Sequence, residues 1–224
     1  MQTTTESFEF LELPHNARYH AISEYGQPPD DWHEDIYARA MEEAPERGFL
    51  IDNIQFSGFS SQGDGASWTG YVLLPDFIEY YNKPEHDDYT QYVVLRELIK
   101  DGWCEEQITI GRHGYYYNHS GMMRSSGVDD RIHYVDDDSV VDRGILEGAN
   151  VKELANSIDT DAMFNDLDEW VLRKAQAYAN DIYKQLKEEY EHYTSEEYFK
   201  DLCDINGWRF DKHGKLVEGD HHGI

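Results

Sequence analysis

Apolar and polar residues recur with two different periods along the first fifth of the chain. Residues 8–13, FEFLEL, alternate apolar and acidic side chains, which predicts a β-strand. The following segment, NARYHAISEYG, has a helical composition and stops at Gly26. The next, DDWHEDIYARAMEEAPERG, repeats apolar residues at helical spacing and stops at Gly48. The pattern therefore predicts one strand and two helices before residue 49.

Two strong strand patterns flank a glycine-rich stretch in the next segment. FLIDNIQFSGF and ASWTGYVLL both read as strands, and SGFSSQGDGASWTG connects and overlaps them at residues 57–70. This order predicts a β-hairpin with an irregular loop.

The middle of the chain alternates between helical and extended patterns. PDFIEYYN begins a helix, and TQYVVLRELIKDG predicts a longer one that ends at Gly102. QITIGRHGYYYNHSGMMRSS contains two strand-like pieces around Gly114, and DRIHYVDD predicts another strand.

The C-terminal third is dominated by helix-forming sequence. Residues 151–193 repeat apolar side chains near the helical period, and a second helix is predicted to start at Ser195–Glu197. GWRFDKHGKLV predicts a small hairpin that turns at residues 212–214. The positions expected to share the apolar face of the long helix are Leu167, Trp170, Val171, Lys174, Tyr178, Ile182, Leu186 and Tyr190.

Strands and helices do not alternate regularly, so the predicted class is α+β: an antiparallel sheet with flanking helices and a helical C-terminal part. We expect an α+β domain at residues 1–141 that contains the hairpin. Residues 142–217 are expected to form a helical segment packed on it, and residues 218–224 a disordered tail.

The net charge of −27 changes the functional picture most. It arises from 46 acidic residues against 19 lysines and arginines. Such a chain repels phosphate backbones, so direct nucleic-acid binding through a basic patch is not expected. Three interpretations remain: solubility or salt adaptation, attraction to a partner with a basic surface, and carboxylates that imitate the phosphates of DNA.

Cysteine usage and hydropathy indicate the compartment. Cys104 and Cys203 lie far apart without CxxC spacing, which predicts two free thiols and no zinc or redox motif. No segment has the length of a membrane span. We therefore expect a soluble cytoplasmic protein with no cofactor. The sequence is compatible with a homodimer.

The glycine-rich stretch is the first candidate site. It matches neither a phosphate-binding loop nor a dinucleotide loop, because it lacks a lysine and leads into a strand. As a ligand pocket it would offer Gln62, Asp64 and Ser67. As a structural feature it would be a bulged hairpin turn around Asp64.

The segment GRHGYYYNHSGMMR is the second candidate. If one strand continues through it, His113, Tyr117 and His119 share a face and are ligand-binding candidates, together with Arg112. Two histidines with a third such as His133 could form a metal site. Histidines on a solvated sheet face are commoner, so we favour that interpretation. Arg112 and Arg124 are expected either to form internal ion pairs or to hold an anion.

The third candidate is an acidic belt between residues 128 and 170, which carries thirteen acids against Arg131, Arg143 and Lys152. It could be an ordinary solvated face or a ridge that binds a basic protein. The predicted partner-binding residues are Asp136, Asp137, Asp138, Asp142, Asp159, Asp161, Asp166, Asp168 and Glu169.

Several of these motifs together resemble a family of bacteriophage proteins labelled "antitoxin of toxin–antitoxin stability system". The resemblance is carried by FSGFSSQGDGASWTG, DWHEDIYARA, RHGYYYNHS and IYKQLKEEYEHYTSEEYFKDLCDINGWRFDKHGKLV, which together span most of the chain. It implies a phage origin and action in the host cytoplasm, and it implies no catalytic residue.

Two functional hypotheses follow. In the first, the chain is a non-enzymatic phage protein that binds and inhibits a host factor with a basic surface. It would act as an antitoxin or an anti-defence protein, and DNA mimicry is one form that this inhibition could take. In the second, it binds a small ligand or nucleotide, or is an enzyme, with its pocket between the SQGDGAS loop and the HGYYYNH strand. No nucleophile motif commits the sequence to catalysis.

Overall fold

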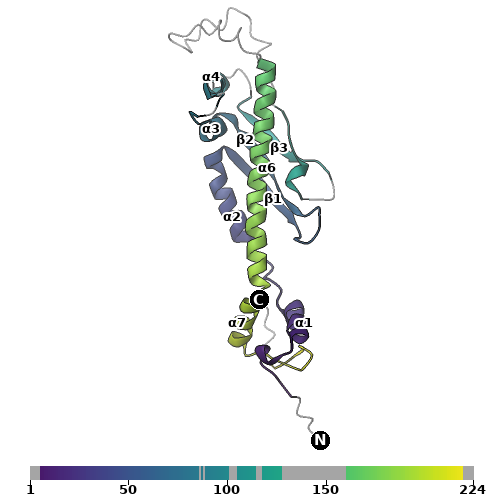
Figure 1. The fold of residues 1–224 in the computed structure, drawn as a ribbon. Helices are drawn as coiled ribbons and strands as arrows, with labels where there is room; N and C mark the ends of the chain where they lie inside the picture. The colour runs from purple at the N-terminus through teal and green to yellow at the C-terminus, as the bar shows by residue number, and fades with distance from the viewer. Residues whose placement is uncertain are drawn as a thin grey trace, which may run out of the picture. The chain divides into compact units, whose positions relative to one another are not determined.

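The computed structural model describes residues 6–85, 87, 89–100, 105–114, 118–127 and 160–218 (Figure 1). Contacts divide the chain into two compact units, Tyr37–Tyr183 and a second one that joins Met1–Ile36 to Lys184–Ile224. We call them the sheet unit and the terminal unit. The predicted α+β class with an antiparallel sheet and a helical C-terminal region is confirmed. The predicted division at residues 141 and 142 lies outside the described residues. Of the tail predicted at residues 218–224, Glu218 instead ends a β-strand, and the rest lies outside the described residues.

The sheet unit is built on a four-stranded antiparallel sheet in the order β1-β2-β3-β4. The strands are β1 (Phe49–Ser57), β2 (Gly65–Leu73), β3 (Gln107–Arg112) and β4 (Met123–Ser125). The predicted hairpin is confirmed, since β1 pairs with β2 from Phe49↔Val72 to Ser57↔Gly65, with one irregularity between Ile51 and Asn53. Because neighbours in sequence are neighbours in the sheet, every loop between strands lies at an end of the sheet.

The long helix α6 (Thr160–Tyr193) forms the other half of the sheet unit's core. The apolar positions that the sequence assigns to its inner face are buried from Leu167 to Ile182, whereas Lys174 is half-buried. In the part of α6 that belongs to the terminal unit, Leu186 is buried and Tyr190 is half-buried. Within the sheet unit, α6 crosses the sheet in Figure 1, and the buried Trp68 indole donates a hydrogen bond to the Ala175 carbonyl at 3.1 Å. The Phe49 ring lies 5.2 Å from Trp68 and 5.7 Å from Tyr178, measured between ring centroids.

Three shorter helices complete the sheet unit. Helix α2 (Glu34–Glu43) and the 3-10 turn η2 (Ala44–Arg47) precede the sheet, and the Tyr178 hydroxyl bonds the Ala40 carbonyl at 2.7 Å. Helices α3 (Leu74–Tyr81) and α4 (Tyr89–Lys100) follow β2. As predicted, Gly48 ends the first of these segments, in a left-handed conformation with φ of 76°.

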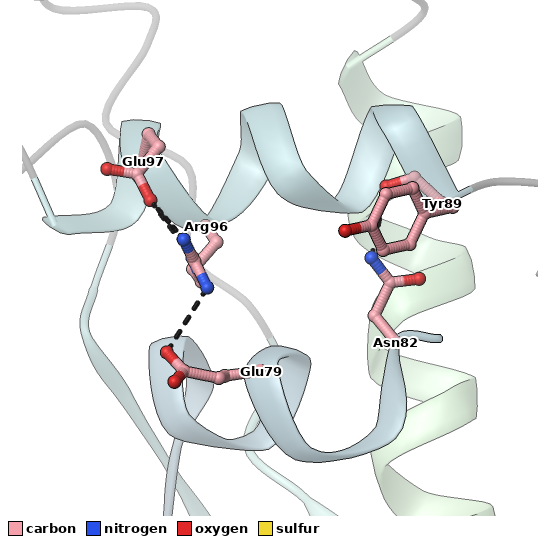
Figure 2. A network of polar contacts seen from close by, with 5 residues as sticks. All are labelled: Glu79, Asn82, Tyr89, Arg96 and Glu97. Atoms are coloured by element: carbon pink, nitrogen blue, oxygen red, sulfur yellow. Dashed lines mark hydrogen bonds and ion pairs between the residues drawn. The ribbon is translucent and has the colours of Figure 1, made fainter. Parts of the chain in front are cut away.

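Arg96 fastens α3 to α4, as Figure 2 shows. Its guanidinium lies 3.1 Å from the Glu79 carboxylate on α3 and 2.8 Å from that of Glu97 on α4. At the other end of the pair, the Asn82 side chain donates to the Tyr89 carbonyl at 3.0 Å. One guanidinium thus contacts a carboxylate on each of the two helices.

The terminal unit has its own core. Helix α1 (His15–Tyr25) ends at Gly26 as predicted, and α7 (Glu196–Asn206) begins within the predicted stretch Ser195–Glu197. The Ser195 hydroxyl caps α7 by accepting from the Tyr198 N–H. The predicted C-terminal hairpin is present as β5 (Arg209–Phe210) and β6 (Leu216–Glu218). The buried side chains of this core are Phe10, Leu13, Ala17, Ala21, Phe199, Cys203 and Phe210.

The strand predicted at residues 8–13 is wrong. Only Phe8 pairs, with Phe210, and Phe10–Glu12 forms the 3-10 turn η1. The Glu12 carboxylate accepts from the Glu9 N–H at 2.8 Å and stabilises the turn. A three-residue period then buries Phe10 and Leu13, whereas a strand would have placed them on opposite faces.

Gly48→Ala is expected to destabilise the sheet unit by about 2 kcal/mol or more, because the left-handed backbone disfavours a side chain and the new Cβ would lie 2.5 Å from the Phe77 nitrogen. Gly111→Ala is the control, since a Cβ there meets nothing within 4 Å. Urea unfolding followed by circular dichroism measures both. Equal stability of the two variants would contradict the backbone assignment at Gly48.

Cys203 is expected to resist thiol reagents in the folded protein. Its side chain is buried, and burial raises the pKa of the thiol to about 12, so little thiolate exists at neutral pH. In a Cys104→Ser background, Ellman's reagent should modify Cys203 only after denaturant unfolds the terminal unit. Rapid modification without denaturant would show that this core is open.

Candidate functional site

The loop between β1 and β2 is closed by its own carboxylate. One oxygen of Asp64 accepts hydrogen bonds from the Ser60 and Ser61 N–H groups at 2.8 and 2.6 Å, and the Asp64 N–H donates to the Ser61 carbonyl at 3.0 Å. The carboxylate that would contact a ligand therefore organises the loop. Gln62 is exposed in the same loop, and Ser67 is buried in β2.

An aromatic stack attaches the loop to α6. The Phe59 ring stacks between Phe56, at 5.7 Å, and Tyr183, at 5.4 Å. The Tyr183 hydroxyl also donates to the Gly58 carbonyl at 3.0 Å. Partial burial raises the pKa of Tyr183, and the nearby Asp64 carboxylate adds to the effect. These contacts give the tip of the hairpin a fixed position on the sheet unit.

Two glycines of the stretch permit close approach. A Cβ on Gly58 would lie 3.0 Å from the Asp64 carboxylate, and one on Gly65 would lie 2.8 Å from the His119 ring and 3.0 Å from its Cα. Side chains at these positions would push the loop and the His119 segment away from the hairpin. The excess of small residues therefore has a structural explanation.

The two strand-like pieces predicted around Gly114 are β3 and β4, and no single strand runs from residue 112 to residue 119. Strand β3 ends at Arg112, and Gly114 adopts a φ of 111°. His113 is exposed, whereas His119 caps the 3-10 turn η3 (Ser120–Met122), its Nδ1 accepting from the Gly121 N–H at 2.9 Å. Tyr117 lies outside the described residues. The two histidines thus have different environments and do not share a strand face.

An amide network joins the β3–β4 connection to the hairpin. The Arg112 guanidinium donates to the side-chain oxygens of Gln55 and Asn118, and the Asn118 amide donates to the Phe56 carbonyl at 2.9 Å. Arg124 donates to the Gly121 and Met123 carbonyls at 2.9 and 2.7 Å. Within the described residues, neither arginine pairs with a carboxylate, so the expected internal ion pairs are not found there.

Two polar contacts connect this region to α6. The Ser120 hydroxyl donates to the Asn180 side chain at 2.7 Å, and the Ser125 hydroxyl donates to Asp168. Asp168, predicted to bind a partner, is therefore half-buried against β4.

The rest of the predicted acidic belt is described only in part. Asp166 and Glu169 are exposed on α6, and the backbone of Asp161 lies in the first turn of that helix. Five predicted residues lie outside the described residues: Asp136, Asp137, Asp138, Asp142 and Asp159. The partner-binding ridge stays a prediction, with Asp166 and Glu169 as its described, accessible members.

The described residues contain no group of three or more histidine, cysteine, aspartate or glutamate side chains arranged to hold a metal ion. His133 lies outside this part of the chain. Every described helix is also too short or too polar to cross a lipid bilayer, including the long α6.

Sequence reasoning missed the residues that fasten this region. Phe59, Asn118, Asn180 and Tyr183 supply the stack and the amide bonds, but each is a single aromatic or amide side chain without a motif. Their roles depend on which segments meet in space.

A family model matches residues 32–196, which include the hairpin loop, the β3–β4 connection and most of α6. The chain belongs to this family, described as a domain of unknown function (DUF8835). Comparisons with curated proteins and with solved structures find no match. The DUF8835 match begins within the sequence of the terminal unit and extends through the whole sheet unit.

Asp64→Ala is expected to loosen the hairpin loop and to cost about 1 kcal/mol, because two backbone N–H groups lose their acceptor. Hydrogen exchange at Ser60 and Ser61 should accelerate. Gln62→Ala, in the same loop but with an exposed side chain, should leave both stability and exchange unchanged. Unaltered exchange in Asp64→Ala would mean that the carboxylate does not organise the loop.

Proposed function

We propose that this chain is a non-enzymatic, strongly acidic protein that binds and inhibits a protein with a basic surface. The observation that carries the proposal is the excess of carboxylates. If every one of the 19 lysines and arginines paired with a separate acid, 46 − 19 = 27 carboxylates would still lack a basic partner. Such a field attracts basic surfaces over long range and accelerates their association.

Two of the arginines bond neutral oxygens instead of carboxylates. Arg112 bonds amide oxygens and Arg124 bonds backbone carbonyls, so in the described part of the chain neither offsets an acidic side chain. The exposed Asp166 and Glu169 are three residues apart on α6 and therefore on neighbouring positions of one helix surface. A partner that normally binds nucleic acid suits this arrangement, because its basic surface is built to meet spaced negative charges.

The phage resemblance supplies a source for the partner. A phage protein acting in the host cytoplasm would meet host factors, and antitoxin or anti-defence action by binding and inhibiting one of them agrees with the excess of carboxylates. We therefore place the partner among basic, DNA- or RNA-handling host proteins, with this chain occupying their nucleic-acid site.

The small-ligand alternative receives less support. Asp64 serves the loop's own N–H groups, His119 accepts from Gly121, and Ser120 donates to Asn180. A ligand that needed these same atoms would have to replace bonds that the loop already makes, which lowers the gain from binding.

Affinity capture from a bacterial host lysate at about 50 and 500 mM NaCl tests the proposal. The wild-type chain should retain a basic protein in stoichiometric amount at low salt and lose it at high salt, because screening weakens exposed charge pairs. Asp166→Lys with Glu169→Lys should reduce retention more than Glu42→Lys with Glu46→Lys, which reverses two exposed acids of the α2–η2 segment. Retention of no protein at low salt, or retention that is independent of salt, would overturn the proposal.

A further inference from the structure

Four half-buried aromatic rings gather where the start of α2 meets the end of α6 within the terminal unit. The Trp32 ring lies 5.9 Å from Tyr190, at an interplanar angle of 53°. Tyr193 follows Tyr190 by three residues on α6, which places both on neighbouring positions of the helix surface. The Tyr193 ring lies 5.0 Å from Tyr198 at 83°, so the cluster extends into α7.

These rings are partly accessible. Trp32, Tyr190, Tyr193 and Tyr198 all keep intermediate exposure, unlike the fully buried Phe199 that faces the core beside them. Large aromatic side chains that stay half-exposed side by side form the kind of surface that carries binding energy in protein interfaces.

Three carboxylates come from the same segments of the chain as the rings. Asp31 and Asp35 are exposed at the start of α2, and Glu189 is half-exposed on α6. Asp31 precedes Trp32 and Glu189 precedes Tyr190 in the chain, so two of the carboxylates adjoin two of the rings. Burial raises the pKa of Tyr193, and the charges of Glu189, Asp35 and Asp31 raise it further. Within the described residues, none of the three carboxylates forms an ion pair.

We propose that Trp32, Tyr190, Tyr193 and Tyr198, together with Asp31, Asp35 and Glu189, form a docking surface for an arginine- or lysine-rich segment of a partner protein. This aromatic–acidic surface deepens the proposed function and rests on it. An arginine can stack its planar guanidinium on a ring while its N–H groups reach a carboxylate, and this surface offers both in one place.

The chain already uses the same chemistry for its own bases. The Arg47 guanidinium lies 5.0 Å from the centre of the Tyr178 ring and 5.6 Å from that of Tyr80, and the Lys174 ammonium lies 4.9 Å from the Tyr81 ring. In those places the cation comes from the chain itself. At the aromatic–acidic surface, we expect the partner to bring further cations to half-exposed rings and exposed carboxylates of the same kinds.

Charge complementarity selects this occupant over others. A nucleic acid or an anionic lipid surface would bring phosphates toward three carboxylates and a chain of net charge −27. A basic peptide segment is attracted by the same charges, and its side chains can cover the half-exposed rings.

Fluorescence anisotropy with a fluorescein-labelled nona-arginine peptide at about 150 mM NaCl tests the surface. Asp31→Asn with Asp35→Asn should weaken binding at least tenfold, and Trp32→Leu should do the same, since each removes one half of the stacked and charged contact. The matched controls are Glu42→Gln with Glu46→Gln, which removes two exposed acids elsewhere, and Tyr19→Leu, which removes an exposed ring of α1. Both controls should bind within about twofold of the wild type, because the surface keeps its rings and charges.

The outcomes separate the surface from the function. Selective loss in the two surface variants supports the surface. If the wild type binds the peptide and the surface and control variants lose equal affinity, the proposed docking surface is wrong, but the proposed function is not contradicted. No binding by the wild type would overturn both. Thermal unfolding of each variant checks the fold. If Trp32→Leu does not fold, the two asparagine substitutions still test the surface, because they preserve the shape of the side chains.

Discussion

The packing of α6 on the sheet is the interaction on which the sheet unit depends. Trp68, buried at the centre of β2, bonds the α6 backbone at Ala175, and Tyr178 on the next turn packs against Phe49. Around this apolar seam, α6 holds the hairpin tip through Tyr183 and the β3–β4 connection through Asn180. The buried face of α6 therefore gives these polar, glycine-rich loops a defined position on the sheet unit, in addition to the hydrogen bonds within each loop.

This arrangement gives the polar residues of the loops a structural role. Asp64 binds the N–H groups of its own loop, and His119 fits against Gly65, where no side chain could be accommodated. Such groups look like site residues in a sequence because they are small, polar and clustered. In the folded chain Asp64 and His119 maintain one loop geometry.

Periodicity predicted most of the elements but not the polar contacts. The apolar face of α6, the β1–β2 hairpin and the Ser195 cap follow from local rules, because each depends on neighbours within a few residues. The same rules gave a wrong prediction for residues 8–13. Alternating side chains predicted a strand there, but a 3-10 turn with a three-residue period buries Phe10 and Leu13 together. The sequence did not predict the aromatic–acidic surface, because Trp32 and Tyr190 are distant in the chain. The abundance of acids did predict attraction to a basic partner.

The proposed inhibition is tested most directly by competition at the partner. The basic host protein retained by this chain would be purified, loaded with its own labelled DNA or RNA, and titrated with the chain while the labelled nucleic acid is followed by mobility shift. The account predicts stoichiometric displacement of the nucleic acid, because the carboxylates occupy the same basic surface. Simultaneous binding of the chain and the nucleic acid to the partner would contradict it.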